Sequence, residues 1–452
     1  MNGSSIEVLL TPVWNGTGIQ SIAVRIRANI LAKQDAPLFS LYKRVTNKTF
    51  VDISDTMEIR DENGPLHYRI ETESPMHAEL HHYKAQRATS GAVTVAYAAV
   101  LGQAGSNPCF DLGIEPGGIT GSGMTFLPLF AGGLYDITVD WNLSQMPQGS
   151  QGVWTYGSGR ATVTGPPSML TEAFYCAGHV KSVVSDRFAF YWLADQDYNF
   201  TEIAAWNRDT YTVLSHFFQD GNGQYSIFIR RAKDEKQGGT ALGRSYMMIC
   251  PDNQQPVMNK FLFAHEMIHS WVHMDDEPFG ACTWYVEGMA EYYSAALLWR
   301  NALISRAELA AEMNRRARQY YENPHIRITN EEAGTRLFAD PDITRIPYGR
   351  GMFYLMQVDA DIRRATQEKQ SLDDVLFSMI ARYRQNPKTG NREWLEEITF
   401  ILGNDGKIAF EQMRAGGTIA PADDCFRHAL RPFKTTGAVR GTQMPCTLWQ
   451  FE

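Results

Sequence analysis

Short runs of alternating apolar and polar residues mark the first third of the chain. Alternation with a period of two residues is typical of a β-strand with one buried face. It occurs in the following segments: Ile6–Pro12, Ser21–Ala28, His67–Thr72, Ala92–Val100 and Leu134–Trp141. Glycines and prolines separate these segments, as in loops between strands, and a Gly/Ser-rich stretch ending in Pro166-Pro167 indicates a domain boundary. We therefore expect residues 1–166 to form an N-terminal β-sandwich-like domain.

Beyond this boundary, strand-like and helix-like segments alternate. Strands are predicted in three apolar segments: Phe188–Leu193, Tyr225–Arg230 and Arg244–Cys250. The spacing of apolar residues predicts helices at Thr201–Phe218 and at Gln255–His273. Residues 167–300 are therefore predicted to be a second, mixed domain.

Almost all of the chain after Thr283 has the apolar spacing of helices. Helices are predicted in the following segments: Trp284–Arg300, Arg306–Glu322, Gly349–Arg364, Leu372–Tyr383 and Arg392–Leu402. The first of them ends the mixed domain, and residues 301–452 are predicted to form an α-helical C-terminal domain. Strands and helices that occupy separate parts of one chain indicate the α+β class.

The charge balance argues against two broad classes of partner. The 452 residues contain 42 Lys and Arg against 50 Asp and Glu, and this net charge of −8 is unfavourable for general binding of nucleic acid or of an anionic membrane. No apolar run is long enough to span a bilayer, and residues 1–10 lack the features of a signal peptide, so we expect a cytoplasmic protein. The six cysteines include no CxxC pair, which argues against a thiolate zinc site. The sequence does not predict an oligomeric state.

One short motif indicates metal chemistry. His265-Glu266-Met267-Ile268-His269 has the pattern H-E-x-x-H within a predicted helix, so both imidazoles lie on one face, one turn apart. Two histidines in this arrangement can bind the same Zn²⁺ ion. Glu266 is offset by one residue and can take a proton from water at the metal, then return it to a leaving group. The alternative is an ordinary helix that carries two histidines.

The next predicted helix supplies carboxylates for the same site. Glu287 is the natural third ligand, because two histidines and one carboxylate leave the fourth position of a catalytic Zn²⁺ open. We therefore expect one Zn²⁺ per chain. Glu291 lies one turn later on the same face, where it can accept a hydrogen bond from the other ring nitrogen of a ligand histidine. A solvent-exposed helix charge is the alternative for Glu291.

These residues also establish a family resemblance. HExxH followed by W-x-x-E-G-x-A-x-Y-Y at residues 284–293 resembles the gluzincin metallopeptidases, most closely the glycyl aminopeptidase family M61. The alanyl-type aminopeptidases and leukotriene A4 hydrolase are more distantly similar. Residues 347–351, 359–363 and 371–374 also match segments of glycyl aminopeptidases. The resemblance implies a thermolysin-like zinc catalytic core in residues 167–300 and a helical domain that closes the cleft. Family members often carry a C-terminal PDZ module, which we do not expect here.

The resemblance assigns roles to two further residues. In these families, a tyrosine at the position of Tyr348 donates a hydrogen bond to the oxyanion of the tetrahedral intermediate. A neutral phenol suits charge that develops only in the transition state. Glu266 and Tyr348 are therefore the expected catalytic residues. Arg350 stands where the family usually has lysine, so a substrate contact is expected there, with a surface charge as the alternative.

The resemblance also implies a glycine-rich edge strand before the zinc helix. Residues 238–245 match it and contain the substrate-binding candidates Gly238, Gly239, Gly243 and Arg244. The backbone of an edge strand can bind an extended peptide by β-augmentation. Gly243 stands where the family has a glutamate that recognises the free α-amine of the substrate. Arg244 would repel an ammonium and attract an anion, unless it is a solvated loop charge.

Three functions are compatible with this sequence. The first is a zinc metallopeptidase of the glycyl aminopeptidase type, which acts on a peptide. The second uses the same zinc site to hydrolyse, open or rearrange a non-peptide small molecule, for example in secondary metabolism, and the missing glutamate favours it. The third is a catalytically silent binding protein, which the complete set of catalytic and zinc-binding residue types argues against.

Overall fold

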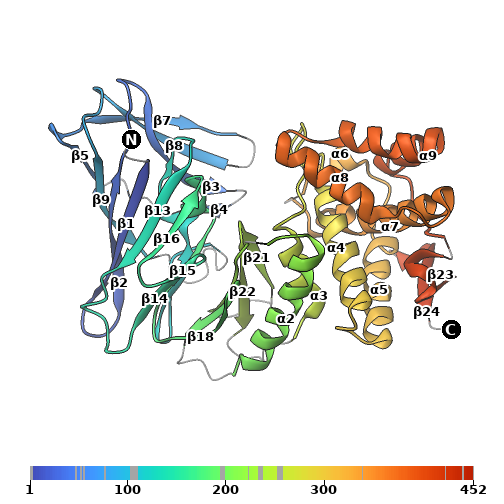
Figure 1. Ribbon diagram of the computed structural model, residues 1–452. Helices are drawn as coiled ribbons and strands as arrows, with labels where there is room; N and C mark the ends of the chain where they lie inside the picture. Colours follow the sequence, from blue (N-terminus) through green and yellow to red (C-terminus); the bar gives the residue numbers. More distant parts are fainter. Residues whose placement is uncertain are drawn as a thin grey trace. The chain divides into compact units, whose positions relative to one another are not determined.

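The computed structural model places most of the chain in two units (Figure 1). It describes residues 4–45, 48–50, 53, 56–75, 78–101, 110–193, 199–221, 223–232, 238–251, 258–337, 339–422, 424–439 and 442–450. The first unit comprises Met1–Tyr211 and Asp220–Met258, and the second comprises Thr212–Gln219 and Asn259–Glu452. Strands dominate the first unit and helices the second, which confirms the predicted α+β class. The division into domains 1–166, 167–300 and 301–452 stays a prediction.

The largest sheet of the first unit has the strand order β16-β13-β1-β2-β9-β5-β6. The bounds of its strands are β1 Ser5–Trp14, β2 Ile19–Ala28, β5 Glu58–Asp61, β6 Gly64–Pro65, β9 Val93–Val100, β13 Tyr135–Trp141 and β16 Ala161–Gly165. The alternating pattern of the sequence explains how this sheet is buried. Ile6, Val8 and Leu10 of β1 enter the hydrophobic core, and the residues between them are more exposed.

Two smaller sheets share this core. One has the order β12-β3-β8-β7, with β4 paired to β3, and the other has the order β10-β11-β17-β14-β15. Their strands are β3 Pro37–Val45, β4 Lys48–Thr49, β7 Tyr68–Glu73, β8 Ala78–Ala85, β10 Gly113–Glu115, β11 Gly118–Ser122, β12 Leu129–Phe130, β14 Gln151–Trp154, β15 Gly157–Ser158 and β17 Phe174–Gly178. Tyr83 of β8 and Tyr175 of β17 lie in the same buried cluster as the residues of β1.

A fourth sheet of the first unit has the order β18-β19-β20-β22-β21. Its strands are β18 Val180–Ser185, β19 Phe188–Leu193, β20 Tyr225–Ala232, β21 Gly238–Leu242 and β22 Ser245–Pro251. β19 has the predicted bounds, and all residues of β19 and β22 are buried. The glycine-rich stretch singled out by the family resemblance forms β21, which lies at the edge of the sheet and is antiparallel to β22. The short helix α1 Ser168–Thr171 precedes this sheet, and α2 Thr201–Phe217 follows β19.

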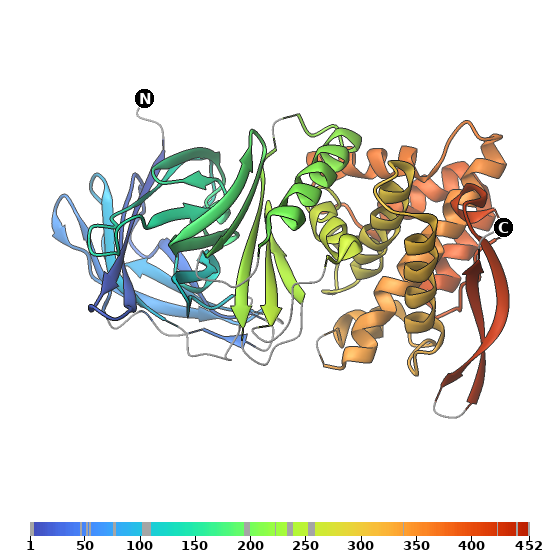
Figure 2. The same ribbon diagram turned by 90° about the horizontal axis from the view of Figure 1, so that it is seen from below.

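The second unit is built mainly from helices (Figure 2). The helices are α3 Lys260–Ile268, α4 Thr283–Arg300, α5 Arg306–Tyr321, α6 Asn330–Thr335, α7 Pro341–Thr366, α8 Leu372–Gln385 and α9 Asn391–Arg414. Side-chain caps explain several of their first residues. Ser305 and Glu308 form a capping box at the start of α5, and Ser371 and Asp374 form another at the start of α8. Within the described residues, no helix is long and apolar enough to cross a membrane.

The helix that carries the HExxH motif is shorter than the predicted helix Gln255–His273. Asn259 caps α3, because its side-chain oxygen accepts a hydrogen bond from the backbone N–H of Leu262. The first residues of the predicted helix lie outside the described residues. At the other end, α3 stops at its C-cap residue His269. His265 therefore lies in the last turn of this helix, and His269 is the residue that follows it at the C-cap position.

Two other helices are longer than predicted. α7 contains Pro347 in its interior and begins eight residues before the predicted start at Gly349, at Pro341. α9 extends beyond the predicted end at Leu402. Gly403 leaves the helical conformation, with φ of 64° and ψ of −147°, and the helix continues after this kink. Proline and glycine often mark helix boundaries, but Pro347 lies inside α7 and Gly403 lies inside α9.

The chain ends in a hairpin that the sequence analysis does not predict. β23 Arg431–Val439 and β24 Thr442–Gln450 pair in antiparallel register (Figure 2). Trp449 of β24 stacks on Phe353 of α7, with 5.3 Å between ring centroids. Asn314 of α5 forms hydrogen bonds with the backbone N–H and carbonyl of Trp449. The α-helical C-terminal region therefore ends in two strands that pack on its helices.

α4 and α7 cross at a pair of glycines. A Cβ added to Gly351 would lie 1.9 Å from the carbonyl oxygen of Trp284, and one added to Gly288 would lie 2.6 Å from carbon atoms of Gly351. The two helix backbones are in direct contact at this point and leave no space for a side chain. A larger residue at either position would therefore displace one of the helices. Glu287 adjoins Gly288 and Tyr348 lies one turn before Gly351, so the crossing sets the distance between them.

We expect Gly351→Ala to destabilise the second unit, because the new methyl group overlaps the Trp284 carbonyl. Overpacking typically lowers the free energy of unfolding by about 1–3 kcal/mol, and contact with rigid backbone favours the upper end. Gly18→Ala is the control, because a Cβ there meets nothing within 4 Å. Denaturant unfolding should show a lower midpoint for Gly351→Ala only. Equal midpoints for the two variants would contradict the close crossing.

Candidate metal centre

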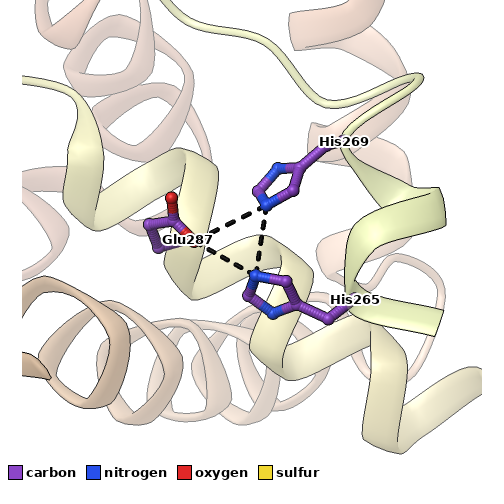
Figure 3. Close-up of side chains that lie close together, drawn as sticks. All are labelled: His265, His269 and Glu287. Atoms are coloured by element: carbon purple, nitrogen blue, oxygen red, sulfur yellow. Dashed lines mark hydrogen bonds and ion pairs between the residues drawn. The ribbon is translucent and has the colours of Figure 1, made fainter. Parts of the chain in front are cut away.

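Three potential metal ligands converge in the second unit (Figure 3). His265 lies in the last turn of α3, His269 caps that helix, and Glu287 lies in the first turns of α4. Nε2 of His265 lies 3.1 Å from Nε2 of His269 and 3.1 Å from Oε2 of Glu287. The distance from Nε2 of His269 to the same carboxylate oxygen is 3.6 Å. The HExxH spacing and the next helix therefore bring the predicted ligand atoms to one place.

These distances fit a zinc ion. A tetrahedral Zn²⁺ with bonds of ~2.0 Å to nitrogen and oxygen separates its ligand atoms by roughly 3.3 Å. The three distances of 3.1, 3.1 and 3.6 Å lie close to this value. Two imidazoles and one carboxylate are also the donor set of catalytic zinc sites, which leave one position open for water or substrate. The residues therefore fit the metal that the sequence predicts.

The electrostatics of the three ligands favour a cation. Burial alone would raise the pKa of Glu287, but the imidazoles of His269 and His265 outweigh it and hold this pKa well below its usual value. Burial alone would lower the pKa of His265, but the Glu287 and Glu291 carboxylates outweigh it and raise this pKa. Glu287 is therefore ionised, and the carboxylates favour positive charge beside the rings.

Glu266 lies between the two histidines in the sequence of α3. Burial is the main cause that raises the pKa of its carboxyl group above the usual value. His265 and His269 oppose this rise, and nearby carboxylates add to it. A raised pKa brings a carboxylate closer to the proton affinity that general acid–base catalysis requires near neutral pH. Glu266 is thus suited to accept a proton and to release it again.

Tyr348 of α7 stacks on the first histidine of the motif. Its ring centroid lies 5.8 Å from that of His265, with 2° between the two ring planes. The guanidinium carbon of Arg345 lies 5.4 Å from the Tyr348 ring centroid, within the range of a cation–π contact. Burial, followed by the charges of Glu287 and Glu266, raises the pKa of Tyr348 well above its usual value. The phenol therefore keeps its proton and is able to donate a hydrogen bond.

Glu291 is buried beside His265. Its side chain is 13 % exposed, and Oε1 lies 3.1 Å from Nδ1 of His265, the ring nitrogen that does not face Glu287. The interpretation of Glu291 as a solvated helix charge is therefore wrong. Its other carboxylate oxygen lies 2.7 Å from Nε of Arg316.

Arg316 is a residue of this region that the sequence analysis does not single out. It lies on α5 four residues after Glu312, and both side chains are on the buried face of that helix. A charged i, i+4 pair on an otherwise apolar face is the sequence signal that indicates such a buried ion pair. Without the structure, the partner of this pair on α4 is not identifiable, because it lies far away in the sequence.

Arg350 does not have the environment expected of a substrate contact. Its side chain is completely buried, and its terminal nitrogens donate hydrogen bonds to Oδ1 of Asn330 and to the carbonyl oxygen of Ile326, both at 2.7 Å. The surface alternative is wrong for the same reason. Arg350 therefore joins α7 to the first residue of α6 and to the segment before it. Its burial corrects the expectation of a substrate contact.

The candidates around β21 belong to the first unit. Arg244 forms an ion pair with Asp220 and donates hydrogen bonds to Tyr211 and to the carbonyl oxygen of Gln224, so its charge is compensated within the unit. This corrects the expectation that Arg244 is available to attract a substrate anion. Gly243 occupies the turn between β21 and β22 with φ of +50°, and not the edge strand itself.

The two glycines of β21 are close to its neighbour. A Cβ on Gly239 would lie 2.1 Å from the carbonyl oxygen of Met247, and the Tyr246 hydroxyl donates a hydrogen bond to the carbonyl of Gly238. Small residues therefore allow β21 to pack closely on β22. The strand sequence Gly-Gly-Thr-Ala-Leu carries no acidic side chain. β21 can therefore offer a substrate its backbone groups and the Thr240 hydroxyl, but no carboxylate.

Comparisons with known proteins relate the chain to aminopeptidase folds. No protein-family model and no curated protein matches the sequence. Over 95 % of its length, the chain is similar to the aminopeptidase N family protein from Idiomarina loihiensis, with 13 % identity, 79 % of that chain covered and a TM-score of 0.66. The M1 zinc metallopeptidase from Deinococcus radiodurans is similar over 93 % of this chain and 96 % of its own, with 16 % identity and a TM-score of 0.54.

A further similar structure is leukotriene A4 hydrolase from Saccharomyces cerevisiae. It matches 93 % of this chain and 68 % of its own, with 12 % identity and a TM-score of 0.55. At these identities the similarity shows a shared fold. It confirms, for the fold, the more distant resemblance to aminopeptidases and leukotriene A4 hydrolase. The closer resemblance to glycyl aminopeptidases stays a prediction.

We expect protein purified without added metal to contain close to one zinc ion per chain. His265→Ala and Glu287→Ala should each lose it, because two remaining ligands do not hold a catalytic zinc tightly. His325→Ala is the control, because His325 pairs with Asp340 and not with the candidate ligands. Elemental analysis measures the metal content. Stoichiometric zinc in both ligand variants would refute the assignment.

Proposed function

We propose that this protein is a zinc-dependent metallohydrolase in which His265, His269 and Glu287 hold one Zn²⁺ ion. The observation that carries this proposal is the convergence of their donor atoms at distances that suit a tetrahedral ion. Glu266 lies on the same helix, and Tyr348 stacks on one of the ligands. The fold shared with the M1 zinc metallopeptidase from Deinococcus radiodurans supports the same chemistry.

Glu266 and Tyr348 have different roles in the proposed hydrolysis. When bound, zinc acts as a Lewis acid that polarises a carbonyl group and lowers the pKa of a water molecule. Glu266 accepts a proton from the attacking water and delivers it to the departing group. Tyr348 donates its phenolic hydrogen to the oxygen that becomes negative as the tetrahedral centre forms. Because burial keeps the phenol neutral, the donor is present throughout the reaction.

We propose that the substrate is a peptide and that the catalytic machinery is of the glycyl aminopeptidase type, without that family's specificity for a free α-amine. The sequence around Glu287 and Tyr348 supports this assignment through its resemblance to that family. The resemblance also assigns substrate binding to the backbone of edge strand β21, which can pair with an extended peptide. Among the proteins with a similar fold, a mutant of the Deinococcus radiodurans enzyme has been crystallised with a Tyr-Ser-Ala substrate.

A non-peptide small molecule is the second candidate substrate. The observation in its favour is that β21 carries no acidic side chain, so the strand offers no carboxylate for the α-amine of a peptide. In this alternative the same zinc site hydrolyses, opens or rearranges the small molecule. A catalytically silent binding protein is the third candidate. The presence of Glu266 and Tyr348 beside the ligands argues against it.

We expect Glu266→Gln to retain zinc and to lose hydrolysis. Glutamine keeps the shape of the side chain but cannot accept the proton of water, and general-base help contributes about 10²–10⁴-fold to the rate. Turnover is measured on a peptide library by mass spectrometry, and metal content by elemental analysis. Glu393→Gln on α9 is the control for loss of a buried carboxylate, because Glu393 pairs with Arg392 and not with the ligands or their neighbours. Wild-type turnover by Glu266→Gln would contradict its role as the base.

Because β21 carries no acidic side chain, and Gly243 stands where glycyl aminopeptidases have a glutamate, we predict weak recognition of the free α-amine of a substrate. A charge-assisted hydrogen bond to an ammonium contributes about 1.5–3 kcal/mol, or roughly 10–100-fold in affinity. We therefore expect acetylation of the α-amine of glycine and alanine arylamides to change kcat/KM by less than about 10-fold. The paired free and acetylated substrates control for the leaving group. Robust cleavage of only the free-amine forms would show that another acidic residue recognises the amine.

A further inference from the structure

Arg316 is a buried charge at the contact of three helices. Its side chain is 3 % exposed, and Nε lies 2.7 Å from Oε2 of Glu291 on α4 and 2.7 Å from Oε1 of Glu312 on α5. Its terminal nitrogens donate hydrogen bonds to the backbone carbonyl of Glu291 and to Oγ of Ser294. The guanidinium carbon lies 5.5 Å from the ring centroid of Phe261 on α3. The guanidinium therefore joins α5 to both helices that carry the proposed zinc ligands.

Glu291 connects this guanidinium to His265. One carboxylate oxygen faces Arg316 at 2.7 Å, and the other lies 3.1 Å from Nδ1 of His265. Nε2 on the opposite side of the same imidazole faces His269 and Glu287. A carboxylate held at Nδ1 favours the tautomer in which Nε2 is free to bind a metal. The position of Glu291 beside Nδ1 thus favours a hydrogen on that nitrogen of the proposed zinc ligand and leaves Nε2 for the metal.

We propose that Arg316 is a positioning residue of the zinc site, which acts by clamping Glu291 against His265. This inference depends on the proposed zinc site. According to this proposal, a residue of α5 affects the affinity for zinc, although α5 carries none of the proposed zinc ligands. Outer partners of ligand histidines typically change metal affinity by about 10–100-fold when they are lost.

The balance of charges explains why Glu291 needs this clamp. Arg316 lies between the carboxylates of Glu291 and Glu312, whose side chains are only 13 % and 10 % exposed. Without the guanidinium, two buried negative charges would face each other, which is strongly unfavourable. Glu312 would keep its second ion pair with Arg315. Glu291 would keep its contact with His265 and the longer-range attraction of Arg315, but no arginine in hydrogen-bond contact, so Glu291 is the carboxylate that we expect to move.

Arg315 offers a matched control on the same helix. It is the neighbour of Arg316 in the sequence and binds the same carboxylate, Glu312, through two nitrogens. Its side chain is half exposed, and its ion pair is with Glu312, not with Glu291. Arg315→Met therefore removes an arginine from the Glu312 cluster without removing the clamp on Glu291.

The test measures the zinc affinity of the metal-depleted full-length protein by competition with a chromophoric chelator. We expect Arg316→Met to bind zinc about 10–100-fold more weakly than the wild type, and Arg315→Met to stay within about two-fold. The visible absorption of Co²⁺ bound in place of zinc should change for Arg316→Met only, because it reports the geometry of the ligands. The unfolding midpoint of each metal-free variant shows that the comparison is made on folded protein.

A double variant distinguishes action through Glu291 from general loosening. If Arg316 acts through Glu291, Arg316→Met should cost no further zinc affinity in a protein that already carries Glu291→Gln. A full additional loss in that background would overturn the proposal. If Arg316→Met does not fold, Arg316→Lys replaces it, because a single ammonium cannot reproduce the contacts of the guanidinium with Glu291, Glu312 and Ser294.

The outcomes separate this inference from the proposed function. Wild-type zinc affinity in Arg316→Met, or in Arg316→Lys where the former is unfolded, would overturn the positioning role alone. Absence of zinc binding by the wild-type protein would overturn the proposed function together with this inference. Weaker binding by Arg316→Met, with unchanged binding by Arg315→Met and no further loss beside Glu291→Gln, would support it.

Discussion

The candidate site depends on the close crossing of α4 and α7. Gly288 and Gly351 bring the two backbones into direct contact, because neither residue places a side chain between them. Glu287 adjoins one of these glycines, and Tyr348 precedes the other by one helical turn. If the helices moved apart by the width of a methyl group, Glu287 on α4 and Tyr348 on α7 would move apart by a similar distance. A packing constraint within the helical unit thus controls the geometry of the chemistry.

The same region concentrates buried charge, which is costly unless it is compensated. Three carboxylates, those of Glu266, Glu287 and Glu291, lie near the histidine pair. Each lies in a different environment, and that environment determines its chemistry. The imidazoles keep Glu287 ionised, burial raises the pKa of Glu266, and Arg316 pairs with Glu291. Carboxylates close together on two helices are therefore suited to three different tasks: binding a cation, moving a proton and orienting a ring.

Local patterns predict the strands and the histidine pair well, because both depend on the direction in which successive side chains point. β19 has the predicted bounds Phe188–Leu193, and His265 and His269 share one face of α3. Contacts between distant residues are not predictable in this way. Pro347 reads as a helix boundary, yet α7 continues through it because packing against α4 overrides local preference. The burial of Arg350 likewise depends on partners that local spacing does not reveal.

The candidate metal site and the strand that resembles the amine-binding strand of glycyl aminopeptidases lie in different parts of this chain. The three candidate ligands belong to the second unit, whereas β21 belongs to the first. The backbone itself opposes a glutamate at Gly243. Its φ of +50° is strained for residues with side chains, and a Cβ would lie 2.8 Å from the carbonyl oxygen of Glu172. Restoring the family's carboxylate at this position therefore requires a different turn, not only a different residue. The convergence of the three ligand atoms therefore carries the proposed metal chemistry, whereas the shared fold and the side chains of β21 do not identify a particular substrate.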